Sequence, residues 1–560
     1  MNTPTFGPIT QPGVNPRNPW GILRRACLGL ACLAIAIGLF YGVENWRGWR
    51  AWSVERAAVL KNNTPLELSE IVPPPVPDDE NLANTEPFLL LFDSKRDANG
   101  QLSNTNLGAG QSWCDFSAIN GRSVYPGGIG SWAGLGMGAS NGVINLTEWQ
   151  QYFRSSTHYI KQHVAEARRR HGLPVPDVLP TGAEARPTNG PPGYPLPMVP
   201  GNPAEDVLLA LDVFKDEMAT AANGTRRTHA RFPIRYEDGP SALLPHLATV
   251  KQLSHVFTLR GLARLQADQT DGALGDLRTA LFLAEAAKDE PLLISQLVRC
   301  AGLGLALQTA WEGQIHHRWS VSQLETFQGW LAAIDVLPGM HRSLAEERIM
   351  MEGIIRTSLA SAQGRREMTG MFDALSSIFG GGEVSPIVAS SYFSWAPRGW
   401  LYASAAEISR ALRILETASP SELVPLANTW PPAPPSDSLR FALYRVYLRR
   451  DSHTTWVHAV FKAYRAQAQV RLAQTACALE RHWLEKGKYP ERLEELVPRW
   501  IDALPTDPID QHPLRYKRVG DDQFRLWSIA ANAKDDGGDR AHAADVPLRS
   551  LDWVWEWPSP

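Results

Sequence analysis

The strongest hydrophobic pattern in the chain is a run from Ala26 to Val43, eighteen residues without a charge. In a helix these eighteen residues rise about 27 Å, close to the ~30 Å thickness of a hydrocarbon core. Arg24 and Arg25 precede the run, and tryptophans and arginines follow it, as at the borders of a membrane-spanning helix. The pattern predicts a single transmembrane helix, with residues 1–19 as a disordered tail and residues 20–52 as the anchor with its flanks.

A cleaved signal peptide is the alternative interpretation of this run. The two arginines, the apolar core and the tripeptide Ala34-Ile-Ala36 fit that pattern. The apolar residues continue beyond this cleavage motif to Val43, which favours a retained anchor. Arginines are balanced on the two sides of the run, so only the shortness of the N-terminal tail favours a large extracytoplasmic portion.

Residues 53–142 follow as a region rich in proline and glycine. Ile71 to Glu80 reads IVPPPVPDDE, which favours polyproline II and predicts an extended acidic spacer between the membrane and the body. Gly128 to Ala133 has the letters of a dinucleotide-binding fingerprint. It lacks the flanking strand and helix that such a site needs, which favours a flexible loop.

Helical periodicity dominates residues 143–430, the predicted helical ectodomain. Asn145 and Asn202 stand at the positions of helix N-caps. Between Val256 and Asp289, bulky and small residues alternate at the spacing of a tetratricopeptide unit. This spacing predicts stacked helical hairpins, with an irregular helical bundle as the equally favoured alternative.

Residues 437–560 are predicted to combine a long helix with a β-hairpin. The helix extends from about Thr455 to Glu485. The alternating runs Pro513–Arg518 and Gln523–Ile529 are joined by Val519-Gly-Asp-Asp522, a hairpin pattern. The predicted fold class is therefore mainly α, with a small C-terminal α+β module.

The motifs G-K-Y-P, L-P-T-D-P, P-L-R-Y, F-R-L-W-S-I-A-A-N and D-D-G-G follow one another in this last segment. Their order resembles the C-terminal globular region of type II secretion major pseudopilins, over roughly Leu472 to Asp539. In that family the membrane helix is fused directly to the long helix behind a peptidase site. Here the apolar run ends at Val43, so the resemblance implies a reused fold module rather than assembly into a pilus.

The layout of the whole chain is also similar to that of uncharacterised bacterial envelope proteins, with P-P-P-V-P-D-D-E-N and G-W-L-Y among the shared motifs. This resemblance implies an architecture and no activity. Together with the apolar run, it predicts a single-pass protein of the bacterial inner membrane whose bulk lies on the periplasmic side.

In the pseudopilins the loop after the final strand binds calcium. The corresponding loop here carries Asn532, Asp535, Asp536 and Asp539 around two glycines. Carboxylate and amide oxygens are ligands that calcium prefers, so the resemblance implies a structural calcium site, with a solvated turn as the alternative. The aspartates also spell the D-D-x-x-D motif of magnesium-dependent prenyl synthases, but the two glycines disfavour the rigid helix which that chemistry needs.

Composition and charge narrow the function further. The chain has 44% hydrophobic and 20% charged residues, which is typical of a folded globular protein. Its net charge of −3 gives no electrostatic reason to expect nucleic-acid binding. Metalloprotease and phosphate-loop motifs are lacking from the sequence. Glu346, Glu347 and Glu352, interspersed with arginines, predict a salt-bridged helix face rather than a catalytic carboxylate pair.

The predicted function is a membrane-anchored scaffold that binds other envelope proteins or peptides in a helical groove. No enzyme and no cofactor are predicted, apart from the structural calcium ion. Two alternatives remain open: an accessory of a type II secretion-like apparatus, and a hydrolase whose residues meet only in space.

Overall fold

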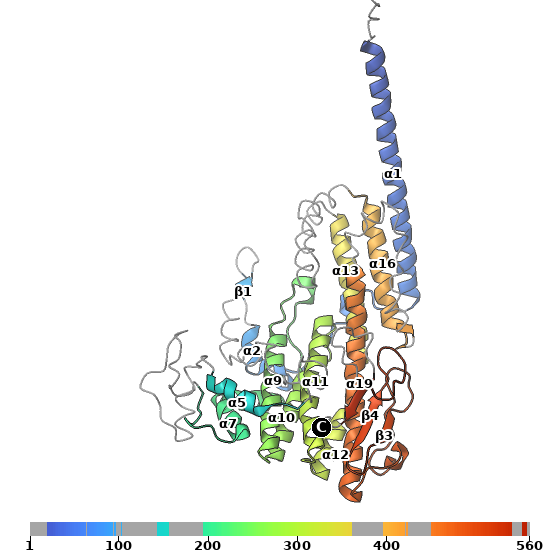
Figure 1. Cartoon of the computed structure of the whole chain (residues 1–560). Coiled ribbons are helices and arrows are strands. Elements are labelled where there is room, and N and C mark those ends of the chain that lie inside the picture. The colour runs from blue at the N-terminus through green and yellow to red at the C-terminus, as the bar shows by residue number, and fades with distance from the viewer. Residues whose placement is uncertain are drawn as a thin grey trace, which may run out of the picture. The chain divides into compact units, whose positions relative to one another are not determined.

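The computed structural model describes residues 19–62, 64–92, 95–96, 102–103, 143–155, 194–360, 396–420, 422–423, 450–539 and 552–556. In this part of the chain the fold is mainly helical, with one three-stranded and one two-stranded antiparallel sheet (Figure 1), which confirms the predicted class. The chain divides into two compact units, residues 1–58 with 354–407 and residues 59–353 with 408–560. The sequence motif of residues 128–133 and the N-terminal tail before residue 19 lie outside the described residues.

The first unit is built on α1 (Pro19–Lys61), a continuous helix that contains the apolar run. None of the apolar stretch of α1 is buried against other described residues. Beyond the run, α1 meets the start of α16 (Arg398–Thr417) at a contact between two glycines, because a Cβ atom on Gly48 would collide with the carbonyl of Gly399. Trp400 donates its indole N–H to the buried Glu44 carboxylate at 3.0 Å. Beyond its apolar run, α1 is therefore packed against the start of α16.

The second unit is built around five long helices (Figure 1): α9 (Pro245–Gln266), α10 (Thr270–Glu285), α11 (Leu293–Ile315), α12 (Val321–Ala332) and α19 (Arg450–Lys486). α9 packs against α10 and α11, and α19 packs against α11 and α12. Gly261 lies at the crossing of α9 and α11, where a Cβ atom would come within 3.2 Å of the Thr309 methyl group. A small residue is therefore favoured where these helices touch.

Shorter segments complete this unit. They are η1 (Leu68–Glu70), η2 (Asp78–Glu80), η3 (Leu82–Asn84), α2 (Phe88–Leu91), β1 (Lys95–Arg96), β2 (Leu102–Ser103), α5 (Leu146–Ser155), α7 (Pro203–Leu211), η4 (Asp212–Phe214), α8 (Lys215–Gly224), η5 (Tyr236–Ser241) and η6 (Leu493–Leu496). The predicted caps are present: Asn145 accepts the backbone N–H of Thr147, and Asn202 accepts that of Ala204.

The stretch of residues 78–92 packs against the body; the sequence analysis places it at the end of the acidic spacer (residues 71–80) and in the membrane-proximal region that follows. Leu82 and Phe88 are fully buried, and the Phe88 ring packs edge-on against Phe232. Asn81 pairs with His229 in an isolated parallel bridge, which ties the stretch to a segment about 150 residues later in the chain. Residues 78–92 therefore form short helical segments, η2, η3 and α2, whose apolar residues pack into the core.

α13 (Leu337–Ala360) places its charges in the interior of the second unit. Arg348 is fully buried and donates to the Glu416 carboxylate at 2.9 Å and to the Pro65 carbonyl at 2.6 Å. Burial raises the pKa of Glu346 to about 8 and that of Glu347 to about 7. Arg348 thus pairs both with Glu352 on its own helix, at 3.6 Å, and with Glu416 of α16, because residues from α16 and from the stretch after α1 pack over α13.

The C-terminal sheet has the order β3 (Arg515–Arg518), β4 (Phe524–Ser528), β5 (Trp553–Glu556), with all neighbours antiparallel. β3 and β4 form the predicted hairpin, in which Arg515 lies opposite Trp527. β5 was not predicted; its run of aromatic and β-branched residues, Trp553-Val-Trp555, is the signal that would have indicated it. Both β4 and β5 contact α19, so the sheet is joined to the helical body.

Candidate metal site in the C-terminal module

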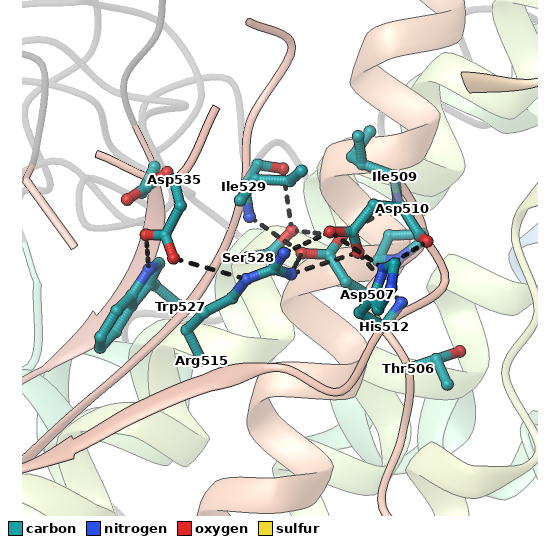
Figure 2. A network of polar contacts seen from close by, with 12 residues as sticks. Thr506, Asp507, Ile509, Asp510, His512, Arg515, Trp527, Ser528, Ile529 and Asp535 are labelled. Atoms are coloured by element: carbon teal, nitrogen blue, oxygen red, sulfur yellow. Dashed lines mark hydrogen bonds and ion pairs between the residues drawn. The ribbon is translucent and has the colours of Figure 1, made fainter. Parts of the chain in front are cut away.

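The polar centre of the C-terminal module is Asp507, a fully buried aspartate in the loop before β3 (Figure 2). Its carboxylate accepts the backbone N–H groups of Ile509 and Ile529 and the hydroxyl of Ser528, each at 2.9 Å. Burial raises the pKa of Asp507, and these three hydrogen bonds oppose that shift by stabilising the charged form. The aspartate thereby fastens the loop of L-P-T-D-P to the end of β4.

Arg515, the first residue of β3, supplies the positive charge of this network. Its guanidinium donates to Asp507 at 2.8 Å, binds Asp510 and lies 3.8 Å from the Asp535 carboxylate (Figure 2). One guanidinium is thus shared among three carboxylates. It is a built-in cation at the place where the loop after β4 returns to the sheet, and it lies beside the predicted calcium loop.

The predicted ligands are only partly brought together. Asn532 donates its amide to the Asp536 carboxylate at 2.6 Å. Asp535 turns toward the sheet, where it accepts the Trp527 indole N–H at 2.9 Å (Figure 2). Asp539 is exposed at the end of the described loop. The four residues therefore do not form one ligand set in this arrangement.

Asp552, directly before β5, is the residue that sequence reasoning missed. Its Oδ2 accepts the backbone N–H groups of Asp536 at 3.0 Å and Gly538 at 2.8 Å. Asp552 is only 5% exposed, and its Oδ1 is buried without a hydrogen-bond partner. Burial, followed by the charges of Asp535 and Asp536, raises the pKa of Asp552 to about 6.

These features fit a cation in part. Three carboxylates lie within electrostatic reach of one another, and one of them has a buried oxygen without a partner, an arrangement that a bound cation would stabilise. Across the described residues, however, no three acidic, histidine or cysteine side chains are already arranged to enclose a metal ion. Asp535 would have to turn from Trp527 and Arg515 to join Asp536 and Asp552.

The loop conformation disfavours the prenyl-synthase interpretation. Gly537 and Gly538 both adopt positive φ angles, 75° and 78°, and residues 529–539 contain no helix. A Cβ atom on Gly538 would also come within 2.6 Å of the Arg525 side chain, so glycine is needed there. The aspartates consequently lie on a turn, and the rigid helical face required by the D-D-x-x-D chemistry is not formed.

Comparison with known proteins adds no relative to this picture: no family model, no characterised protein and no solved structure matches the chain.

Proposed function

We propose that the protein is a single-pass protein of the bacterial inner membrane, with its bulk on the periplasmic side, that acts as a scaffold for other envelope proteins or peptides. The observation that carries this proposal is the contrast between an apolar helical stretch with none of its surface buried and a body that buries its own apolar residues. Exposed apolar surface of that length is stable in lipid and unfavourable in water.

A surface feature of the body supports an interaction role. Met198 and Val199 are 61% and 77% exposed on a loop between the described residues 194 and 202. Arg154 on α5 donates to the carbonyls of Pro197, Met198 and Val199 at 2.9–3.3 Å, and these bonds hold the loop in one conformation. We propose that these two exposed apolar side chains, held on a fixed loop, belong to the surface that contacts another protein.

The test of the anchor uses the full-length chain in its native membranes. Alkaline carbonate should leave the protein in the membrane pellet, and protease added to spheroplasts should digest the body. Release of intact protein into the supernatant, or an N-terminus that begins after Ala36, would contradict the tethered scaffold. Steady turnover of an ester, peptide or glycoside by the purified full chain would favour the hydrolase alternative instead.

A second function is favoured by Asp552: a structural calcium site in a pseudopilin-like C-terminal module. The Asp552 carboxylate binds the loop that carries Asp536 through Oδ2 and keeps its buried Oδ1 without a partner, and the Asn532 amide oxygen lies on the same turn. Calcium bound there would fasten the loop to β5 and relieve repulsion among the carboxylates. The ligand set that we propose is Asn532, Asp535, Asp536 and Asp552, with Asp539 at its edge.

Chelation tests this site. Removal of calcium from the full-length chain should lower its unfolding temperature by a few degrees, roughly as expected for loss of a ligand held well above its dissociation constant. Asp552→Asn should abolish the response, whereas Asp502→Asn, an exposed aspartate outside the loop, should leave it unchanged. An equal response in wild type and Asp552→Asn would exclude this assignment.

A further inference from the structure

One face of α19 carries three basic side chains in succession: His458, Lys462 and Arg465. Their spacing of four and three residues places them on the same side of a helix. Burial lowers the pKa of His458, and the positive charge of Lys462 lowers it further, so these two groups are within electrostatic reach. We call these three residues the α19 basic cluster.

Arg465 is the least compensated member of the α19 basic cluster. Its Nε atom is buried and has no hydrogen-bond partner. Within the described part of the chain, its guanidinium makes no ion pair with a carboxylate. Burial lowers the pKa of Arg465 to about 10, with no acidic neighbour acting in the opposite direction.

Arginines elsewhere in the body show what is normal for this protein. Arg154 binds Asp206, Arg260 binds Asp276, Arg299 binds Glu285 and Arg348 binds Glu416, all at 2.6–2.9 Å. In these four cases, the positive charge of a buried or partly buried guanidinium is thus neutralised by a carboxylate of the same chain. Arg481 Nε also lacks a hydrogen-bond partner, but Glu325 neutralises that guanidinium. Among the described residues no carboxylate does so for Arg465, and a desolvated charge without a counter-charge is unfavourable.

The α19 basic cluster lies beside α11. α11 and α19 are packed neighbours, and the charge of Lys462 acts on the buried Cys300 thiol of α11. Lys462 itself is exposed, and Arg465 is only partly buried. The cluster therefore combines desolvation on one side with access from solvent on the other, which are the conditions under which charge-assisted hydrogen bonds are strongest.

We propose that the α19 basic cluster is a binding site for an oxyanion, the phosphoryl or carboxylate group of a small ligand. The planar fork of Arg465 matches two oxygens of such a group, and Lys462 adds a second positive charge one turn away. The bound anion supplies the acceptor for Arg465 Nε–H. His458 lies at the other end of the cluster and senses the anion through its own protonation. The inference is independent of both the membrane anchor and the calcium loop.

Isothermal titration calorimetry of the full-length chain in detergent tests the site, with inorganic phosphate as the probe at constant ionic strength. We expect saturable binding that Arg465→Gln weakens about tenfold or more, the loss expected for a charge-assisted pair. Lys462→Gln changes an exposed side chain, so it should weaken binding without affecting folding. The matched control is Lys486→Gln, on the same helix but paired with Glu485, which should bind phosphate as wild type does.

A second readout separates binding from structural effects. Phosphate should raise the pKa of His458, followed by its ring resonances in NMR, by roughly one unit, as a nearby opposite charge does. Sodium acetate in place of phosphate identifies the oxyanion, because the tighter of the two titrations shows whether the site prefers a phosphoryl or a carboxylate group. The proposal is overturned if neither salt binds more than chloride does, or if Arg465→Gln and Lys462→Gln bind phosphate as tightly as wild type.

Discussion

Among the described residues, two helices are long and apolar enough to cross a membrane, and their apolar faces lie in opposite environments. None of the apolar window of α1 is buried, whereas 78% of that of α11 is buried in the helical body. The comparison teaches that apolar length alone does not identify a membrane span. The two helices differ in the polar residues that lie among their apolar residues and in the hydrogen-bond partners of those polar residues.

α11 carries polar side chains that only a folded body can satisfy. Arg299 donates to Glu285 at 2.8 Å and to the Asp335 carbonyl at 2.9 Å. Glu312 accepts the backbone N–H of Ile144 at 2.9 Å and the Gln308 amide at 2.7 Å. In lipid these groups would lose their partners at a cost of several kcal/mol. The apolar run of α1 contains no charged residue and needs only a hydrocarbon environment.

The largest expected effect comes from placing one aspartate in each helix. Leu303→Asp buries a charge at a fully buried position of α11 and should destabilise the body by more than about 4 kcal/mol, while membrane attachment persists. Ile35→Asp in α1 should instead cost about 3 kcal/mol of membrane insertion and leave unfolding of the body unchanged. Carbonate extraction and urea unfolding of both variants measure the two effects. The comparison fails if Ile35→Asp destabilises the body or if Leu303→Asp releases the protein from the membrane.

A second variant tests whether the polar residues of α11 stabilise it inside the body. Arg299→Gln leaves the Glu285 carboxylate without its partner and removes a bond to a backbone carbonyl. We expect a loss of about 3 kcal/mol in the free energy of unfolding, measured by urea titration. Arg318→Gln is the control, because its pair with Asp268 is exposed and should contribute about 0–1 kcal/mol. Equal losses in the two variants would mean that burial of the pair adds nothing.

The smallest effect is a pH dependence from Glu312. Burial raises the pKa of Glu312 to about 7, above its value in the unfolded chain. The folded state therefore binds the proton more tightly, and the stability that this contributes is present at acid pH and lost as pH rises toward 7 and beyond. Glu312→Gln should remove this dependence and be more stable than wild type at pH 8 by about 1–2 kcal/mol, with little difference near pH 4. Urea unfolding at both pH values measures it, and parallel pH profiles for the two proteins would refute the assignment.

Much of the fold could be predicted from local patterns. Continuous apolarity indicates α1, helical periodicity indicates the body, and strict alternation indicates the hairpin of β3 and β4. β5 escaped prediction because four residues far from their partner strand give a weak local signal. Residues 81–92 were included in an extended membrane-proximal region because the proline-rich run of residues 73–77 before them obscures the few apolar residues that pack into the core.

The candidate site shows the same limit. The sequence predicts the turn with Asn532, Asp535 and Asp536, because the carboxylates and the glycines are neighbours in the chain. Asp552 is invisible there, because it reaches the turn only when β5 pairs with β4. Arg465 is equally inconspicuous among the charged residues of a long helix, and only packing reveals that none of the described carboxylates pairs with it.

The sequence by itself determined the elements whose cause is local: a charge-free helix long enough for a membrane, amphipathic helices with their caps, and one hairpin with its turn. Tertiary structure alone decided which polar groups meet across long separations, such as Arg348 with Glu416 and Asp507 with Arg515. The physical reason is that a hydrophobic pattern recurs many times along one segment, so it can be recognised there. Desolvation and pairing of a charge depend instead on a few atoms from whichever segments fold together.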